Sequence, residues 1–402
     1  EFNVNLDAYF GVQKAAKQLR MLNAQQFGDM LWQAMKNDGK TPSHDVYGNG
    51  DQAVVPEYLD SNHLIPSDDV DWVDEILRAA VVQSYNLSFT KADKKSNQLF
   101  SLGYYDQQGL VKFSDFKRVS GRFNSEYKLF DDHLRIGENI SLSHSWGTSV
   151  SNNAALGGTL YEAYKFQSIT PVKNLEDEYA GNVFSDIPNP MGKLYRNKDN
   201  QDKKSRLVGN LYAELHLFDG LMFKTSFGVD YNNLYRRSFS PKYDELNASE
   251  KLSSLSNRNA WNFNWVFTNT LTYNKTFGDH TINALLGMES LRNRYEYFTA
   301  SRDGFPSDDP NFRFLDAGDV GTQKNSGAAT EYSMVSYFGK LDYNYHDRYL
   351  VAFTLRRDGS SRLGNNKWGN FPAASVGWRI SNEPFFDVEA ISNLKVRVGW
   401  GQ

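Results

Sequence analysis

The sequence predicts an all-β protein in which a large antiparallel sheet crosses a membrane as part of a β-barrel. Three observations support this fold class: apolar and polar side chains alternate in many segments, the predicted strands are long, and long and short connections alternate along the chain. Strands of roughly ten to eighteen residues exceed the usual globular length of about 5–6 residues, and they are long enough to span a bilayer.

The composition agrees with this fold class and excludes several others. The 402-residue chain contains 27 Phe, 23 Tyr, 8 Trp and 30 Gly but only 11 Pro, which suits strands that have one apolar and one polar face. A net charge of −4 predicts no broad basic surface for nucleic acid, and the lack of cysteine excludes disulfides, thiolate metal sites and cysteine nucleophiles. The mean hydropathy is −0.60, and no apolar run approaches the roughly 18 residues of a transmembrane helix.

The clearest alternation lies in the segment 261–274. Its aromatic and aliphatic side chains fall on one face: Trp261, Phe263, Trp265, Phe267, Leu271 and Tyr273. Its polar side chains fall on the other: Asn262, Asn264, Thr268, Thr270, Thr272 and Asn274. Because successive strand residues point to opposite faces, we expect Phe267 to face lipid and Thr268 to face the lumen of the barrel.

The same pattern predicts about thirteen strands along the whole chain. Their approximate spans are 3–13, 83–91, 97–106, 116–129, 134–146, 204–218, 221–237, 260–276, 280–298, 329–345, 348–357, 372–381 and 393–401.

The connections between these strands alternate in length. Long connections at 14–82 and 148–203, and later ones at 238–259, 299–328 and 358–371, are separated by tight turns such as 218–220 and 277–279. A transmembrane barrel places tight turns on one side of the membrane and long loops on the other. We therefore expect the long connections to face outside the cell and the tight turns to face the periplasm.

The connection 14–82 contains two predicted helices. Asn23 can cap a helix over 24–36, whose apolar residues Phe27, Met30, Leu31, Ala34 and Met35 follow helical spacing. Asp68 or Asp69 can cap a second helix that runs through Trp72, Val73, Ile76, Leu77 and Ala80. This connection is therefore expected to be ordered.

Several runs match one known family in order along the chain. They are 103–109 (GYYDQQG), 135–143 (RIGENISLS), 349–362 (YLVAFTLRRDGSSR), 368–380 (WGNFPAASVGWRI) and 394–402 (LKVRVGWGQ). The chain resembles, over essentially its whole length, the barrel of outer-membrane TonB-dependent transporters of the SusC/RagA type. The family motif within the third run comprises Arg356, Arg357, Asp358, Gly359, Ser360 and Ser361.

The resemblance implies a 22-stranded barrel in the outer membrane of a Gram-negative bacterium, closed by an N-terminal plug and surrounded by outer-membrane lipid. It also implies import of a nutrient with energy delivered through TonB, and a SusD-like surface lipoprotein that closes over the long loops as a lid. The substrates of the family are glycans or peptides, and a glycan is the favoured expectation here. The resemblance implies neither an enzyme nor a nucleic-acid partner.

The chain differs from the family pattern in extent. Residue 1 is expected to enter the first barrel strand at once, with no plug, TonB-binding segment or leader before it. A sheet of about thirteen strands cannot close into such a barrel by itself, because single-chain bacterial barrels have even strand numbers. We therefore expect the chain to be a fragment of a longer protein.

An acidic segment offers the one candidate for a metal site. Carboxylate oxygens bind Ca²⁺, and the candidate ligands are Asp308, Asp309, Asp316 and Asp319, with Asp303 nearby. The spacing is not that of an EF-hand, and a solvated acidic loop is the favoured explanation of these residues. No other cofactor is expected.

Aromatic residues of the long connections are candidates for contact with a sugar or with the lid. They are Tyr47, Tyr58, Tyr161, Tyr164, Tyr179 and Trp368. The alternative interpretation is that these rings pack the loops against each other. The run Arg356–Arg357–Asp358 is expected to form a salt-bridged strand end, and the Gly-Ser-Ser that follows is typical of a turn.

Two other functions fit parts of the same pattern. A passive porin-like channel would show similar strands without a plug. A soluble β-rich protein that binds or cleaves glycans would also be rich in aromatic residues, but it would have no reason to place its long loops at one end of its strands.

Overall fold

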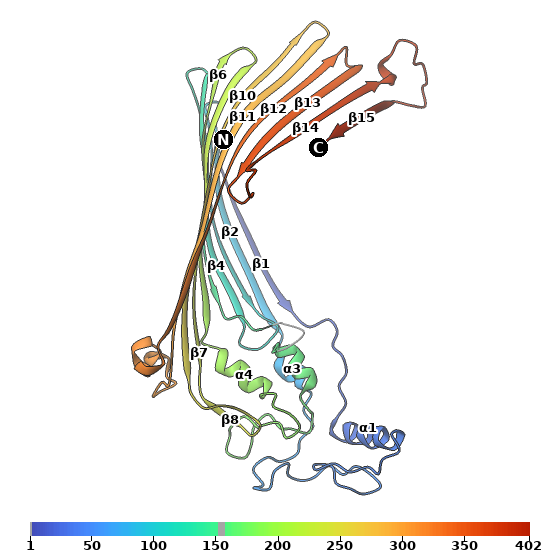
Figure 1. Cartoon of the computed structure of the whole chain (residues 1–402), viewed down its shortest axis with the longest axis vertical. Coiled ribbons are helices and arrows are strands. Elements are labelled where there is room, and N and C mark those ends of the chain that lie inside the picture. The colour runs from blue at the N-terminus through green and yellow to red at the C-terminus, as the bar shows by residue number, and fades with distance from the viewer. Residues whose placement is uncertain (1, 152–156) are drawn as a thin grey trace.

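The computed structural model describes residues 2–151 and 157–402. Its main feature is a 13-stranded sheet in which every pair of neighbouring strands is antiparallel (Figure 1). The strands follow one another in the order of the sequence, with β1 and β15 at the two edges. The predicted fold class and the predicted strand number are confirmed. Residue 1, expected in the first strand, and residues 152–156, within the predicted connection 148–203, lie outside the described residues.

The strands of this sheet are β1 (Phe2–Gln13), β2 (Ala80–Ala92), β3 (Ser96–Gln108), β4 (Asp115–Leu129), β5 (Leu134–Gly147), β6 (Gln201–Phe218), β7 (Leu221–Ser240), β10 (Ser254–Phe277), β11 (His280–Asp303), β12 (Lys324–Tyr345), β13 (Tyr349–Ser360), β14 (Trp368–Arg379) and β15 (Lys395–Gly401). A separate small hairpin pairs β8 (Tyr243–Glu245) with β9 (Ala248–Glu250). The helices are α1 (Ala24–Asn37), α2 (Trp72–Ile76), α3 (Thr159–Lys165) and α4 (Pro190–Asn197).

Tight turns join alternate strands at one end of the sheet, the upper end in Figure 1. The turn between β12 and β13 places His346 and Asp347 in the left-handed region, with φ of 56° and 55°. Two consecutive residues with positive φ match the right-handed twist of a hairpin, and aspartate tolerates this conformation better than most residues. The long connections lie at the opposite end, as the length alternation predicts.

The strand register sorts the side chains into two faces. Phe267 on β10 lies directly opposite Phe227 on β7, whereas the next residue, Thr268, lies opposite Ser226 on β7 and Glu289 on β11. Directly paired residues share a face of the sheet. We call the face that carries Phe267 the apolar face and the face that carries Thr268 the polar face.

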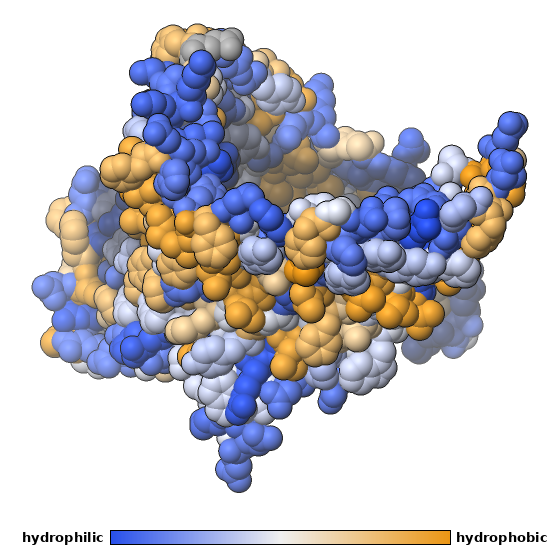
Figure 2. Space-filling model, turned by 90° about the horizontal axis from the view of Figure 1, so that it is seen from above, coloured by the Kyte–Doolittle hydropathy of each residue, from blue (hydrophilic) through white to orange (hydrophobic). Residues whose placement is uncertain are grey.

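The apolar face has the form of a membrane-spanning band. Figure 2 shows hydrophobic residues gathered along one face of the sheet. By register, aromatic residues near the tight turns bound the band on one side: Tyr273, Tyr343, Tyr345, Tyr349 and Trp378. A second group bounds it toward the long connections: Trp146, Tyr235, Trp261 and Trp368. Aromatic girdles flank the lipid-facing band of transmembrane barrels, so the apolar face is the one that contacts lipid.

The sheet curves toward its polar face. The hydroxyl of Tyr212 on β6 donates a hydrogen bond to Glu126 on β4 at 2.8 Å, which means that it passes over β5. It passes at Gly137, where a Cβ atom would overlap the Tyr212 ring. On the same face, nearer the C-terminal edge of the sheet, Arg356 on β13 comes within 3.7 Å of Glu289 on β11. Contacts across two strands require a concave surface, so the polar face lines the inside of the curve.

The long connections fold into ordered clusters beside the strand ends, at the bottom of Figure 1. One cluster packs α2, α3 and α4 together through Trp72, Val73, Ile76, Ala163, Phe166, Met191 and Leu194. A second packs α1 against the segment that follows it and against the connection between β5 and β6; its buried residues are Ala24, Trp32, Tyr47, Ala53 and Ile169. In the described part of the chain, no helix is both long and apolar enough to cross a membrane.

The first predicted helix is confirmed, and part of its apolar stripe is buried. Asn23 caps α1, and its side chain and that of Gln26 form a reciprocal capping box. The buried side of α1 centres on Trp32, with Ala24 and Gly28, whereas Met30 is 42% exposed. Of the residues at helical spacing, Phe27 and Leu31 pack against this buried side, whereas Met30 does not.

The second predicted helix is shorter than expected. Asp71, rather than Asp68 or Asp69, caps α2, because its carboxylate accepts the backbone N–H groups of Val73 and Asp74. The helix ends at Ile76, and Ala80 already belongs to β2. The pairing of β2 with β1 begins at Ala80, so the backbone from Ala80 onward forms sheet hydrogen bonds and does not continue the helix.

Several strand ends also differ from the prediction. The strands β10, β11 and β12 extend past the alternating segments, so the predicted loops 238–259 and 299–328 shorten, and the first of them contains β8 and β9. The predicted loop 358–371 is wrong at both ends, because Asp358, Gly359 and Ser360 belong to β13 and Trp368 begins β14. The helices α3 and α4 inside the connection 148–203 were not predicted.

Candidate functional site

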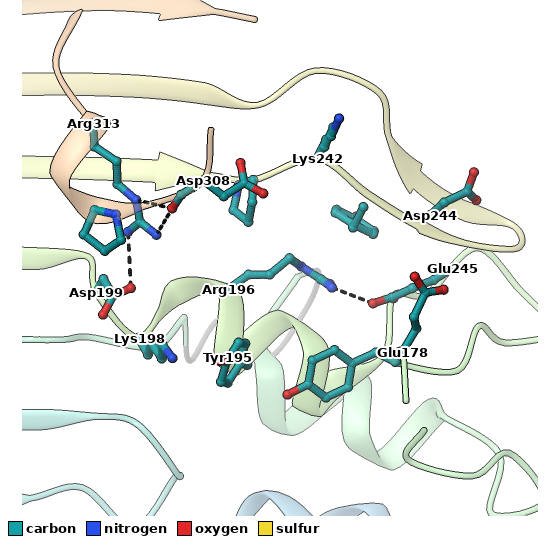
Figure 3. A pocket seen from close by; sticks show the side chains of 14 residues that line it. Glu178, Tyr195, Arg196, Lys198, Asp199, Lys242, Asp244, Glu245, Asp308 and Arg313 are labelled. Atoms are coloured by element: carbon teal, nitrogen blue, oxygen red, sulfur yellow. Dashed lines mark hydrogen bonds and ion pairs between the residues drawn. The ribbon is translucent and has the colours of Figure 1, made fainter. Parts of the chain in front are cut away.

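A pocket of about 530 Å³ opens where three long connections meet at the end of the sheet (Figure 3). The connection between β5 and β6, which includes α4, supplies Glu178, Tyr179, Tyr195, Arg196, Lys198 and Asp199. The connection between β7 and β10 supplies Pro241, Lys242, Tyr243, Asp244 and Glu245. The connection between β11 and β12 supplies Asp308, Pro310 and Arg313. The pocket exists only because these distant segments fold together.

A buried ion pair holds the first two connections together. The Nη1 atom of Arg196 lies 2.5 Å from the Oε1 atom of Glu245, and the Glu245 side chain is 2% exposed. The other carboxylate oxygen of Glu245 accepts the backbone N–H of Asn189 at 2.7 Å. Burial raises the pKa of Glu245, and the guanidinium of Arg196 opposes that rise. Figure 3 shows Arg196 reaching across the pocket wall toward Glu245.

Glycines let the backbones approach this ion pair closely. A Cβ atom at Gly192, in the first turn of α4, would lie 2.7 Å from the Oε1 atom of Glu245. A Cβ atom at Gly181 would overlap the backbone of Glu245 itself. Both positions therefore require glycine for the hairpin β8–β9 to sit against α4.

Arg313 fixes the third connection to the first. Its Nη1 atom lies 3.3 Å from the Oδ2 atom of Asp199, and its Nε and Nη2 atoms donate to the backbone oxygen of Asp308 at 3.1 and 2.8 Å. The guanidinium also lies 4.5 Å from the ring centroid of Phe239, at the end of β7. Because the Arg313 side chain is 9% exposed, these contacts form a structural joint and leave the open part of the pocket to other residues.

Three tyrosine rings line the pocket. The rings of Tyr179 and Tyr195 lie 5.9 Å apart between centroids, and Tyr195 is 44% exposed. The guanidinium of Arg196 lies 3.8 Å from the ring centroid of Tyr243. Burial raises the pKa of Tyr179 and of Tyr243, so both hydroxyls stay protonated donors at neutral pH.

Carboxylates around these rings complete a surface suited to a polyhydroxylated ligand. Figure 3 labels Glu178, Asp244 and Asp308 around the opening, and Asp244 also pairs with Lys251 at 2.9 Å. Carboxylate oxygens accept hydrogen bonds from ligand hydroxyls, and aromatic faces contact apolar ring faces. The arrangement is therefore suited to binding.

Two residues of this pocket were candidates from the sequence: Tyr179 as an aromatic contact and Asp308 as a calcium ligand. Tyr195, Arg196, Tyr243 and Glu245 were missed. No local signal marks them, because Arg196 and Glu245 are 49 positions apart and belong to different connections. Only the folding of α4 and of the hairpin β8–β9 brings them together.

Tyr47, a candidate for contact with a sugar or the lid, lies in the interior of the loop cluster and has almost no exposed surface for such a contact. It is 1% exposed, and its hydroxyl donates to the backbone oxygen of Ala24 at 2.9 Å. Burial raises its pKa to about 12. Its ring packs against α1 so tightly that a Cβ atom at Gly28 would lie 2.8 Å from it. The alternative interpretation, a ring that packs the loops together, describes this residue.

The other aromatic candidates occupy three different environments. Tyr58 is half-buried, with its ring centroid 4.8 Å from that of His63. Tyr161 and Tyr164 lie on α3, where Tyr161 is half-buried beneath Lys165 and Tyr164 packs against the helical cluster. Trp368 is a strand residue of the apolar face, stacked on Tyr337, and its predicted place in a loop is wrong. Of these candidates, only Tyr179 lines the pocket.

The motif residues Arg356 and Asp358 form the salt bridge that the sequence predicts at this strand end. The Nε atom of Arg356 lies 2.8 Å from the Oδ1 atom of Asp358, and its Nη2 atom donates to Ser336 at 2.9 Å on the polar face. Arg357 points to the apolar face, 5.0 Å from the ring centroid of Trp368. Gly359 and Ser360 end β13, so the turn begins only at Ser361.

The acidic candidates for calcium binding have separate roles. The carboxylates of Asp309 and Asp319 accept backbone N–H groups at the starts of two short 3₁₀ turns, and Asp316 pairs with Arg302 at 3.4 Å. Asp308 contributes its backbone oxygen to Arg313, and Asp303 pairs with Lys324 at 3.2 Å. Among the described residues, no group of three or more His, Asp and Glu side chains is arranged to hold a metal ion.

Comparison with known proteins gives consistent results. No family model matches the chain. It is 30% identical over 358 residues to TonB-dependent receptor P3 of Formosa agariphila, which covers 87% of this chain and 35% of that protein. It is 29% identical over 362 residues to TonB-dependent receptor SusC of Bacteroides thetaiotaomicron, which covers 82% of this chain and 34% of that protein. The chain thus spans about one third of the length of these curated relatives.

A solved structure described as the RagAB peptide transporter shares the fold. Its TM-score is 0.81 at 22% identity, and the match covers 99% of this chain and 47% of that chain. Together, the lipid-facing band of the sheet and these relatives define part of the β-barrel of a TonB-dependent transporter, a class of outer-membrane protein of Gram-negative bacteria. Within that class, the chain is of the SusC type.

Proposed function

We propose that the full-length protein imports an oligosaccharide across the outer membrane, with energy delivered through TonB and with a SusD-like surface lipoprotein as a lid over the long connections. The observation that carries this proposal is the similarity to SusC over 82% of this chain. The mechanism is gated uptake, so no residue is expected to make or break bonds in the substrate.

The two faces of the sheet support a route for a polar substrate. The polar face is concave and carries hydroxyl, amide and charged side chains, such as Thr268, Asn262 and Arg356. A polar substrate can exchange its water for these groups as it moves, whereas the apolar face, with mainly aromatic and aliphatic side chains, offers it far fewer partners.

The pocket supports a glycan as the substrate. Tyr179, Tyr195 and Tyr243 supply ring faces, and Glu178 and Asp244 supply acceptors for hydroxyl groups. A peptide is the competing class, because RagAB is described as a peptide transporter.

Uptake by intact cells tests the proposal directly. Cells that express the full-length protein are given labelled oligosaccharides or labelled peptides, with and without a protonophore that removes the energy for TonB. We expect oligosaccharide uptake that stops with the protonophore. If the cells take up only peptides, the substrate is a peptide and not an oligosaccharide. Uptake that continues in the presence of the protonophore would indicate a passive channel.

Substitutions in the pocket test its role separately. We expect Tyr179→Ala and Tyr195→Ala each to weaken oligosaccharide binding by the purified protein about three- to tenfold, since an aromatic contact contributes about 0.5–1.5 kcal/mol. Tyr161→Ala, on α3 and outside the pocket, is the matched control and should bind like the unmodified protein. Unchanged affinity in both pocket variants would move the glycan site elsewhere.

A further inference from the structure

A second pocket, of about 390 Å³, lies beside the pocket described above, which we call the first pocket. Its volume is within the range of about 300–1,000 Å³ that is typical of small-molecule sites. The described residues that line it come mainly from the connection between β5 and β6 and from the end of β7, and they include Thr159, Lys193, Leu194, Asn197, Ser238 and Ser240. The second pocket is therefore large enough to hold part of a ligand.

The two pockets share one wall. Arg196, Pro241 and Tyr243 line both of them. The guanidinium of Arg196 lies 3.8 Å from the ring centroid of Tyr243, and the ion pair with Glu245 fixes this stacked pair in place. A chain-like ligand that lies in the first pocket and extends past the stacked pair enters the second.

The second pocket borders the polar face of the sheet. Register pairs Ser238 and Ser240 on β7 with Ser256 and Ser254 on β10, in the alternation that places Thr268 on the polar face. Both serine side chains of β7 are exposed, and neither hydroxyl forms a hydrogen bond with another described residue. Both hydroxyls are thus available to a ligand on the side of the sheet that faces the lumen.

The second pocket offers neutral polar groups. Its described lining contains no carboxylate. Its two cations are already paired, Lys193 with Glu162 at 2.6 Å and Arg196 with Glu245 at 2.5 Å, and these carboxylate side chains are only 10% and 2% exposed. A charged sugar would lose water here without gaining an unpaired partner, whereas neutral hydroxyl groups can exchange hydrogen bonds with serine.

We propose that the second pocket binds a neutral sugar unit of the same oligosaccharide that occupies the first pocket, with the stacked pair of Arg196 and Tyr243 between the two units. This inference rests on the proposed function, in which the first pocket is the glycan site. A ligand that spans both pockets is a chain of at least two units, and a single sugar fills only one of them. The unit in the second pocket lies at the edge of the lumen.

Calorimetry with the purified full-length protein tests the dependence on chain length. The probes are neutral gluco-, xylo-, manno- and galacto-oligosaccharides of one to six units, and the same chains with a uronic acid at one end. For the series that binds, we expect the affinity to rise at least tenfold from the single unit to the longer chains. Equal affinity at all lengths would overturn the proposal. Acidic chains that bind as tightly as neutral ones would overturn the assignment of a neutral unit.

Filling the second pocket tests its place in the site. Ser238→Trp should remove the gain with length, so that long chains bind at least tenfold more weakly while the single unit binds as before. The matched control is Ser326→Trp, at an exposed position of the polar face on β12 and outside both pockets, which should bind all lengths normally. Tyr195→Ala, in the first pocket, should weaken binding at every length.

Folding of each variant is checked by the change in gel mobility on heating. If Ser238→Trp does not fold, Ser240→Trp fills the same pocket from the neighbouring position on this face and gives the same test. Long chains that bind the folded tryptophan variant as tightly as they bind Ser326→Trp would exclude the second pocket. If Tyr195→Ala still weakens binding in that case, the proposed function stands without the second pocket; if no oligosaccharide binds the unmodified protein, the proposed function itself fails.

Discussion

Arginine introduced at Phe267 or at Thr268 distinguishes the two faces of the sheet most sharply. Phe267 lies six residues from Tyr273 at one boundary of the apolar band and six from Trp261 at the other. At a rise of about 3.4 Å per residue and a tilt near 45°, each boundary is about 15 Å away. An arginine side chain is shorter than that distance, so its guanidinium at position 267 cannot reach either headgroup region.

The expected cost differs between the two positions. Phe267→Arg places a charge in hydrocarbon near the middle of the membrane and should lower the free energy of unfolding by about 2–4 kcal/mol. Thr268 already donates a hydrogen bond to Glu289 at 3.3 Å, so an arginine there meets a carboxylate and water. We expect Thr268→Arg to change the stability by less than about 1 kcal/mol.

Folding the full-length variants into lipid vesicles and titrating with denaturant measures both values. Phe267→Leu is the control for loss of the aromatic ring without a charge, and it should lie close to the unmodified protein. Equal losses for the two arginine variants, or a larger loss for Thr268→Arg, would refute the assignment of the faces. Equal tolerance of both would refute a membrane barrel altogether.

Three further predictions concern the long connections. An epitope inserted after Glu176, in an exposed part of the connection between β5 and β6, should be labelled on intact cells, whereas one inserted within 219–220 should not; the reverse pattern would invert the orientation. Met30→Glu, at an exposed position of α1, should weaken co-purification of a lid lipoprotein at least tenfold, whereas Lys94→Glu in a tight turn should not; unchanged co-purification would place the lid contact elsewhere. Glu245→Ala should destabilise the hairpin β8–β9 by about 3 kcal/mol, because Arg196 loses its buried partner, and faster hydrogen exchange confined to 243–250 would show it; unchanged exchange would mean that the ion pair does not hold the hairpin.

Local patterns in the sequence were sufficient for the strands and for the first helix. In the segment 261–274, alternation alone separates Phe267 from Thr268, because successive strand residues must point to opposite faces. Asn23 identifies the start of α1 because a side-chain oxygen there satisfies a backbone N–H that would otherwise lack a partner. These features depend on neighbours within a few residues, and the sequence displays them directly.

Strand ends and the short helices depended on distant partners. The strands β10 and β11 continue to Ser254 and Asp303, where alternation has faded, because each backbone group there still pairs with the neighbouring strand. Similarly, α2 stops at Ile76 because Ile76 and Arg78 form backbone hydrogen bonds with Lys112 and Leu110, and the residues from Ala80 onward pair with β1. Backbone pairing across the sheet overrides local helical spacing at these positions.

The sequence by itself therefore determined the antiparallel barrel sheet, its two faces, and the gathering of the long connections at one end of its strands. The tertiary structure alone decided the candidate site, because the pocket needs Arg196 and Glu245 from two different connections. The physical reason is the distance along the chain over which each interaction acts. Alternation and capping act between residues close in the chain, whereas a pocket forms from side chains whose positions are fixed only when separate segments pack and pair.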